Sequence, residues 1–157
     1  MFVSIDTVEF KTAIEVASHR AIQSIVRNNK DSLSKKNWLD NLNTHIVGCI
    51  GELAVAKGLH ITWDKSVGTY KKQADLSDNI EVRHRTNPEW QLIVRDNDDD
   101  NKIYILSRGM PPSVIEIVGW IYGHMGKKEE YKKDPGGYGR PAYFVPDNVL
   151  QPMETMP

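Results

Sequence analysis

The sequence predicts a single α/β domain of the α+β type, residues 1–157, in which a mixed central β-sheet packs against two N-terminal helices. Two observations predict this fold class. Apolar residues recur at helical spacing up to about residue 57, and from about Ile61 the chain breaks into short segments patterned as strands. Too few helices separate these segments for a parallel, doubly wound sheet. A chain of 157 residues can bury one core, so one domain is expected.

The two predicted helices lie at the N-terminal end. The first covers about Thr7–Arg27, where apolar residues recur every three or four positions. The second covers about Trp38–Lys57 and ends at Gly58, a residue type common at helix C-termini. Gly48 and Gly51 inside it cost helix stability, so they need a reason such as close packing or room for a ligand.

Five strands are predicted after the helices. The first alternates apolar and charged residues as a half-buried strand does, and the other four are short apolar segments. The strands are Ile80–Arg85, Gln91–Arg95, Lys102–Ser107, Val114–Ile121 and Ala142–Val145. Segment 96–101 is predicted to close a hairpin, 123–139 to be a loop, and the tail after Pro146 to be loosely ordered.

Composition leaves the function open but excludes some classes. The net charge of −1 argues against a strongly basic coat protein for nucleic acid, yet it is compatible with a nuclease whose acidic ligands and basic surroundings cancel. No apolar run approaches 18 residues, and Asp6 and Glu9 interrupt the N-terminus where a signal peptide needs an apolar stretch. No membrane association is therefore expected. Cys49 is the only cysteine, so no intrachain disulfide can form.

Charged residues on and before the first predicted strand form the main candidate site. Residues two apart on a strand point to the same face, so Glu81, Arg83 and Arg85 share one face. A tight turn at Asp78-Asn79 would bring Asp75 beside Glu81 on the strand. Two carboxylates from neighbouring segments can hold a hard divalent cation, and an adjacent arginine can meet a phosphate oxygen.

The second helix supplies three further candidates. His45, Gly48 and Glu52 follow one another at spacings of three and four, which puts them on one helix face. The small residue one turn before Glu52 lets that face approach a substrate backbone closely.

These residues together resemble the pattern of the PD-(D/E)XK nuclease superfamily. The matching positions are Gly51-Glu52 on a helix, Asp75 before a strand, and Glu81-Val82-Arg83 on that strand, within about residues 44–85. The resemblance implies a restriction-endonuclease-like fold and hydrolysis of nucleic acid phosphodiesters, with DNA the expected substrate and Mg²⁺ or Mn²⁺ the cofactor. It implies a small nuclease of phage or bacterial type, acting in the cytoplasm, or in the host cytoplasm if phage-encoded.

The resemblance also implies residue roles. Asp75 and Glu81 would bind the metal, Glu52 would bind it or position water, and Arg83 would stand where the family has lysine. His45, Arg85 and Arg140 are candidate substrate contacts, Arg140 because it follows a glycine-rich segment.

Two positions depart from the family pattern. Ala74 replaces the proline before the aspartate, which matters little. Arg83 replaces the lysine, and arginine effectively cannot lose its proton. If the family lysine must act as a base, this protein is impaired; if it stabilises charge, arginine can serve.

Two other functions stay open beside the nuclease. One is a binding module that keeps the fold and grips nucleic acid or a protein partner without turnover. The other is a structural or assembly protein in which the motif is coincidental. Metal binding separates the nuclease from the structural protein, and DNA turnover separates it from the binding module.

Two other patterns are better explained by structure than by function. The acidic segment 96–101 fails the EF-hand pattern, because Asn101 and Ser107 stand at the glycine and glutamate positions, so a solvated turn is favoured. The four tryptophans are expected mostly in the core; they are Trp38, Trp63, Trp90 and Trp120.

Overall fold

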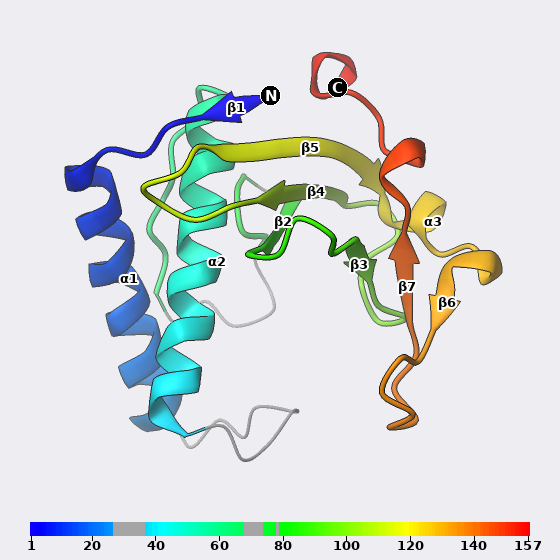
Figure 1. The fold of residues 1–157 in the computed structure, drawn as a ribbon, viewed down its shortest axis with the longest axis horizontal. Helices are drawn as coiled ribbons and strands as arrows, with labels where there is room; N and C mark the ends of the chain where they lie inside the picture. Colours follow the sequence, from blue (N-terminus) through cyan, green and yellow to red (C-terminus); the bar gives the residue numbers. More distant parts are fainter. Residues whose placement is uncertain (27–36, 68–73, 78) are drawn as a thin grey trace.

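The computed structural model of the protein describes residues 1–26, 37–67, 74–77 and 79–157. These residues form three layers, with two helices on one side, a four-stranded sheet in the middle and a three-stranded sheet on the other side (Figure 1). No helix in these ranges has the length and apolar character needed to cross a bilayer. The predicted α+β class, with a mixed sheet against two N-terminal helices, is confirmed.

Both predicted helices are present and begin with side-chain caps. Helix α1 (Thr7–Val26) starts after Asp6, whose carboxylate accepts from the backbone N–H of Glu9 at 2.8 Å. Helix α2 (Trp38–Gly58) starts after Asn37, whose side chain accepts from the backbone N–H of Asp40 at 3.0 Å. Such caps satisfy N–H groups that have no partner inside the helix. The predicted end of the first helix falls outside the described residues.

The middle sheet is mixed, as predicted. Strand β2 runs parallel to β4, whereas β4 pairs antiparallel with β5 and β5 with β1. In spatial order the strands are β1 (Phe2–Val3), β5 (Ile115–Tyr122), β4 (Ile103–Arg108) and β2 (Ile80–Arg85). Strand β2 is therefore at an edge of this sheet.

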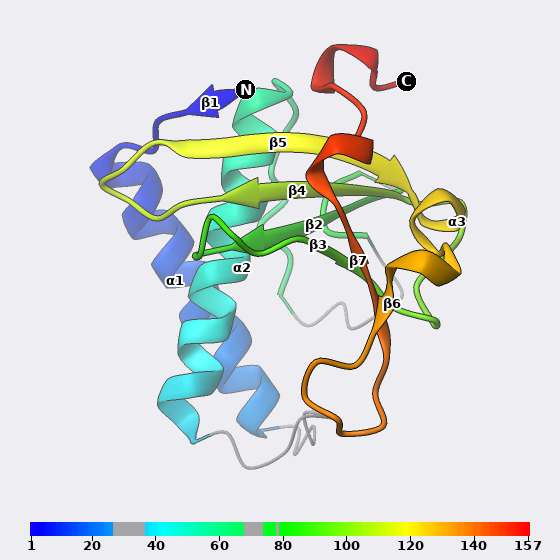
Figure 2. The ribbon, with the colours of Figure 1, turned by 45° about the vertical axis from the view of Figure 1, so that its right-hand side comes forward.

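A second sheet, which the sequence did not predict, covers the face of the middle sheet away from the helices. Its strands are β3 (Leu92–Val94), β7 (Ala142–Val145) and β6 (Lys132–Lys133). In Figure 2, β7 runs at a steep angle to β4 and β5. The prediction that segment 96–101 closes a hairpin was wrong. Strand β4 is already paired on both sides, so β3 pairs with β7 instead and 96–101 leads from one sheet to the other.

Each face of the middle sheet has its own core. Between the helices and the sheet, buried residues include Ile50, Val55, Val82, Ile105 and Ile117. Between the two sheets, they include Leu92, Val94, Tyr104, Leu106 and Val145. The two cores make both faces of the middle sheet interior.

Three further predictions need correction. Segment 123–139 contains a short helix α3 (Gly123–Gly126), a 3-10 turn and β6, so it is not one loop. The tail is packed, because Trp120 donates from Nε1 to the carbonyl of Pro152 at 3.0 Å and Met153 is buried. Trp63 and Trp120 are in the core as predicted. Trp38 and Trp90 are 61% and 54% exposed, because Trp38 is the first residue of α2 and Trp90 lies in the connection before β3.

Gly51 allows α2 to approach β2 closely. A Cβ added at Gly51 would lie 2.3 Å from the Cβ of His84, a distance that side chains cannot tolerate. His84 is buried there, with Nε2 donating to the carbonyl of Gly109 and Nδ1 accepting from the hydroxyl of Ser107, each at 2.9 Å. Burial lowers the pKa of His84 to about 4, which agrees with this neutral arrangement.

We expect the two glycines of α2 to respond oppositely to alanine. Gly51→Ala should lower the free energy of unfolding by about 1–3 kcal/mol, because the added methyl overlaps His84. Gly48→Ala is the matched control, since no described atom lies within 4 Å of its added Cβ. It should raise stability by about 0.5–1 kcal/mol through helix propensity. Denaturant unfolding measures both, and similar effects at the two positions would contradict the close-packing account.

Candidate functional site

Asp75 lies beside β2, as the sequence predicted. An antiparallel bridge joins Leu76 to Ile80 through two backbone hydrogen bonds of 3.0 and 3.2 Å. Asp75 then accepts through Oδ2 from the backbone N–H of Val82 at 2.8 Å. Asp78 of the predicted turn falls outside the described residues. The bridge and the side-chain bond together fix the Asp75 carboxylate against the strand that carries Glu81.

The alternation on β2 is also as predicted. Ile80, Val82 and His84 are buried on the helix side, while Glu81 and Arg83 are half-buried on the side of the second sheet. Arg83 donates from Nη1 to Glu81 at 3.4 Å.

Arg83 has three more partners outside β2, the first being the carbonyl of Ile93, which accepts from Nε at 3.3 Å. Its Nη2 donates to Asp98 at 3.0 Å, and its guanidinium lies 5.0 Å from the centre of the Tyr104 ring. The guanidinium is therefore held by both a carboxylate and an aromatic face.

Lys102 is a site residue that the sequence analysis missed. Its Nζ donates to Oε1 of Glu81 at 2.7 Å, so Glu81 has one cation on each oxygen. Lys102 can be assigned to the site once the parallel register of β2 and β4 is known. In this register Ile103 donates its N–H to the carbonyl of Asn79 at 2.9 Å. Lys102 then shares a face with Tyr104, which is opposite Glu81.

Glu52 is buried at 5% exposure and is fully occupied by partners. Arg20 of α1 donates to both of its oxygens, at 2.6 and 2.9 Å, and Trp63 donates from Nε1 at 2.9 Å. The sequence analysis anticipated neither partner. Among the described residues, no three His, Cys, Asp or Glu side chains form a group that could hold a metal, so Glu52 does not join Asp75 and Glu81 in one cluster.

Asp75 is the carboxyl group of the site whose pKa is raised. Burial, the largest cause, and the negative charges of Glu52 and Glu81 together raise the pKa of Asp75 to about 7, against the opposing effects of the Val82 N–H and the Arg83 charge. Within the described ranges, no lysine or arginine forms an ion pair with Asp75. An added cation between Asp75 and Glu81 would relieve this repulsion. One or two carboxylates together with phosphate oxygens suffice to hold Mg²⁺, so the donor set fits such an ion.

The acidic segment 96–101 is held by Lys127. Nζ of Lys127 donates to the backbone carbonyls of Asp96 and Asp98 and to the carboxylate of Asp100 at 2.7 Å. This clamp orders the loop whose Asp98 binds Arg83. The segment is thus a structural support for the candidate site.

The three predicted substrate contacts lie in different parts of the structure. Arg85 follows Arg83 on the same face of β2. His45 is half-buried on α2, two turns before Glu52, and Arg140 is exposed between β6 and β7. The described contacts bring Glu81, Arg83 and Lys102 together, and the Val82 N–H holds Asp75 against the same strand.

Comparisons with known proteins give the chain no family. No family model, no curated protein and no solved structure matches it.

The pKa of Asp75 predicts a specific pH dependence of stability. The folded-state value of about 7 exceeds the ordinary aspartate value of about 4, so the native state binds more protons between these pH values. Stability attributable to Asp75 should fall as pH rises from about 4 to about 7. His84 has the opposite effect on stability, because its folded-state pKa of about 4 is below the ordinary histidine value. The stability attributable to His84 therefore rises with pH between these two values.

Comparing variants separates the effect of Asp75 on stability from the effect of His84. Asp75→Asn removes the charge but keeps an oxygen for the Val82 N–H, so its melting temperature should exceed that of the wild type increasingly from pH 4 to pH 8. Exposed Asp64→Asn is the control and should track the wild type. A constant offset between Asp75→Asn and the wild type across this range would refute the raised pKa.

Proposed function

We propose that the protein is a metal-dependent nuclease with a restriction-endonuclease-like core, acting on nucleic acid and most readily on DNA. Asp75 and Glu81 would hold Mg²⁺ or Mn²⁺. The observation that carries the proposal is that the Asp75 carboxylate is held against the strand of Glu81 by its bond to the Val82 N–H and has no ion pair with a described lysine or arginine. A pair of oxygen ligands that repel each other without a cation is suited to bind one.

The metal would polarise the phosphate and lower the pKa of a water molecule. The chain's own contribution is two cations of different chemistry next to Glu81. Arg83 keeps its charge and is fixed by Asp98, so it suits stabilisation of a phosphate oxygen. Lys102 carries an amine that can exchange a proton, which Arg83 cannot do. Lys102 would thus supply the function that the resemblance assigns to lysine.

Glu52 would act through its charge. Its oxygens are engaged by Arg20 and Trp63, so Asp75 and Glu81 are the better direct ligands. The charge of Glu52 raises the proton affinity of Asp75 and, by the same physics, its affinity for a cation.

One observation favours the binding module as the second candidate. Lys102 and Arg83 together occupy both oxygens of Glu81, and an incoming metal must displace at least one of them. If these ion pairs persist, the site would hold phosphate without cleaving it.

We expect cleavage of linear or circular DNA, or of RNA, in the presence of Mg²⁺ or Mn²⁺. Lys102→Met should reduce the rate by about 10²-fold or more, the scale of general acid–base catalysis. Glu81→Ala should be at least as severe, because it removes a metal ligand. Arg83→Lys should retain much of the activity because it keeps the charge. Lys133→Met is the matched control at an exposed position of β6 and should be unaffected.

Two outcomes would count against parts of this proposal. If wild type binds every substrate and cleaves none with either metal, the binding module is correct. If Lys102→Met cleaves as fast as Lys133→Met, the role given to Lys102 is wrong.

A further inference from the structure

Arg85 differs from the other arginines whose side chains are buried or half-buried in the described part of the chain. Three of these bind a carboxylate: Arg20 binds Glu52, Arg83 binds Asp98, and Arg108 binds Asp147. Arg85 donates only from Nε, to the backbone carbonyl of Gln91 at 3.3 Å. Its two terminal nitrogens have no carboxylate partner among the described residues.

The neighbours of Arg85 add to its unbalanced charge. Arg83 precedes it by two residues on the same face of β2, and the charge of Arg95, which follows β3, also acts on it. Burial, the largest cause, and the positive charges of Arg83 and Arg95 together lower the pKa of Arg85 to about 10. Arg95 is exposed and likewise has no ion pair with a described residue. A half-buried cation next to two other cations is unfavourable unless an anion binds.

The position of Arg85 relates this charge to the candidate metal site. Glu81, Arg83 and Arg85 follow one another at two-residue steps, so a strand rise of about 3.3 Å puts Arg85 roughly 13 Å along β2 from Glu81. In the described structure β2 is the edge strand of its sheet. A chain of phosphates that runs along this edge can meet both positions at once.

We propose that Arg85 of β2 and Arg95, which follows β3, form a phosphate-binding site for the nucleic acid backbone, separate from the metal ligands Asp75 and Glu81. The proposal rests on the proposed function for the identity of the ligand, but its geometry is independent of turnover. Two guanidinium groups can offer paired N–H donors to phosphate oxygens, which is the recognition that arginine favours. This site would hold a phosphate neighbouring the one that is cut.

A structural role for Arg85 makes a different prediction. If its bond to Gln91 served mainly to join β2 to β3, Arg85→Gln would destabilise the fold. If Arg85 awaits an anion, removing its charge relieves repulsion, and the melting temperature without anions should stay equal or rise.

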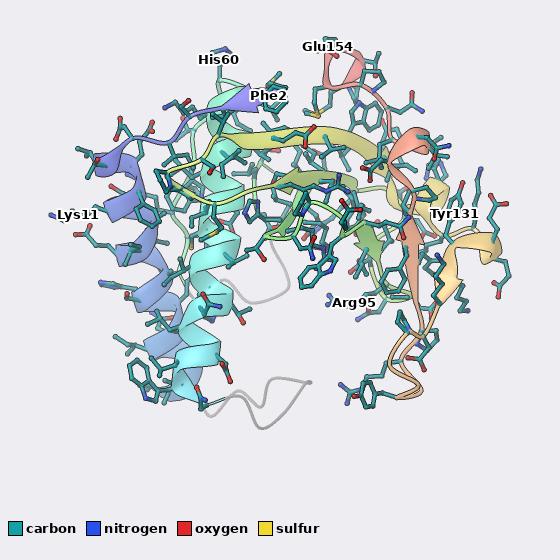
Figure 3. All side chains as sticks on the ribbon, viewed as in Figure 1. Phe2, Lys11, His60, Arg95, Tyr131 and Glu154 are labelled. Carbon is teal, nitrogen blue, oxygen red and sulfur yellow. The ribbon has the colours of Figure 1, made fainter. Side chains whose placement is uncertain are left out.

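The test is binding of fluorescein-labelled duplex and single-stranded DNA in EDTA, where no cleavage occurs, at several salt concentrations. Arg85→Gln and Arg95→Gln should each weaken binding about tenfold. Each should also reduce the slope of log affinity against log salt by about one. Lys11→Gln is the matched control, because Lys11 is exposed on α1 at the opposite side of the molecule from Arg95 (Figure 3). It should change neither quantity.

A second measurement uses inorganic phosphate as the probe. Phosphate should raise the melting temperature of the wild type more than sodium chloride of equal ionic strength, and Arg85→Gln should lose this difference. The inference would be overturned if both arginine variants bound DNA with the affinity and the salt dependence of the wild type. It would also be overturned by a wild type that binds neither DNA nor phosphate, or by one stabilised by phosphate without binding DNA. Loss of binding in the variants of a protein that never cleaves would reject only the nuclease proposal.

Discussion

The constraint on which the site depends is electrostatic: the charges of Glu52 and Glu81 both act on the carboxylate of Asp75 in partly buried surroundings. Negative charges in such surroundings need positive charges nearby. Glu52 forms an ion pair with Arg20, and Glu81 forms ion pairs with Lys102 and Arg83. Asp75 receives only the N–H of Val82 among the described residues. Among the described residues no lysine or arginine forms an ion pair with Asp75, and the charge of Arg83 offsets only part of the increase in its pKa, which is why we propose a divalent ion here.

The fold supplies these charges from separate elements and so ties the site to the packing of all three layers. Arg20 comes from α1, Glu52 from α2 and Glu81 from β2, while Lys102 precedes β4. The close approach of α2 to β2 depends on Gly51, which leaves no room for a side chain beside His84. Behind the site, Lys127 orders the acidic segment that holds Arg83. Charge balance and packing are therefore coupled.

Local patterns predicted the parts of the site that lie within one segment. The alternation at Glu81 and Arg83 predicted their common face, and the short separation of Asp75 from β2 predicted that it lies beside this strand. Partners that depend on long-range packing were not predictable in this way. Lys102 reaches Glu81 only because β2 and β4 pair in parallel. The second sheet was missed because the three residues of β3 pair with β7, some fifty positions later, rather than with the next strand.

The central claim is that Asp75, a carboxylate without an ion pair to a described residue, binds a divalent cation. Carboxyl ¹³C chemical shifts of Asp75, followed by NMR through a pH titration with and without Mg²⁺, test this claim most directly. The account predicts a pKa of about 7 without Mg²⁺ and a decrease of more than about one unit when Mg²⁺ replaces sodium at equal ionic strength. A pKa near the ordinary aspartate value of about 4, unchanged by Mg²⁺, would contradict it.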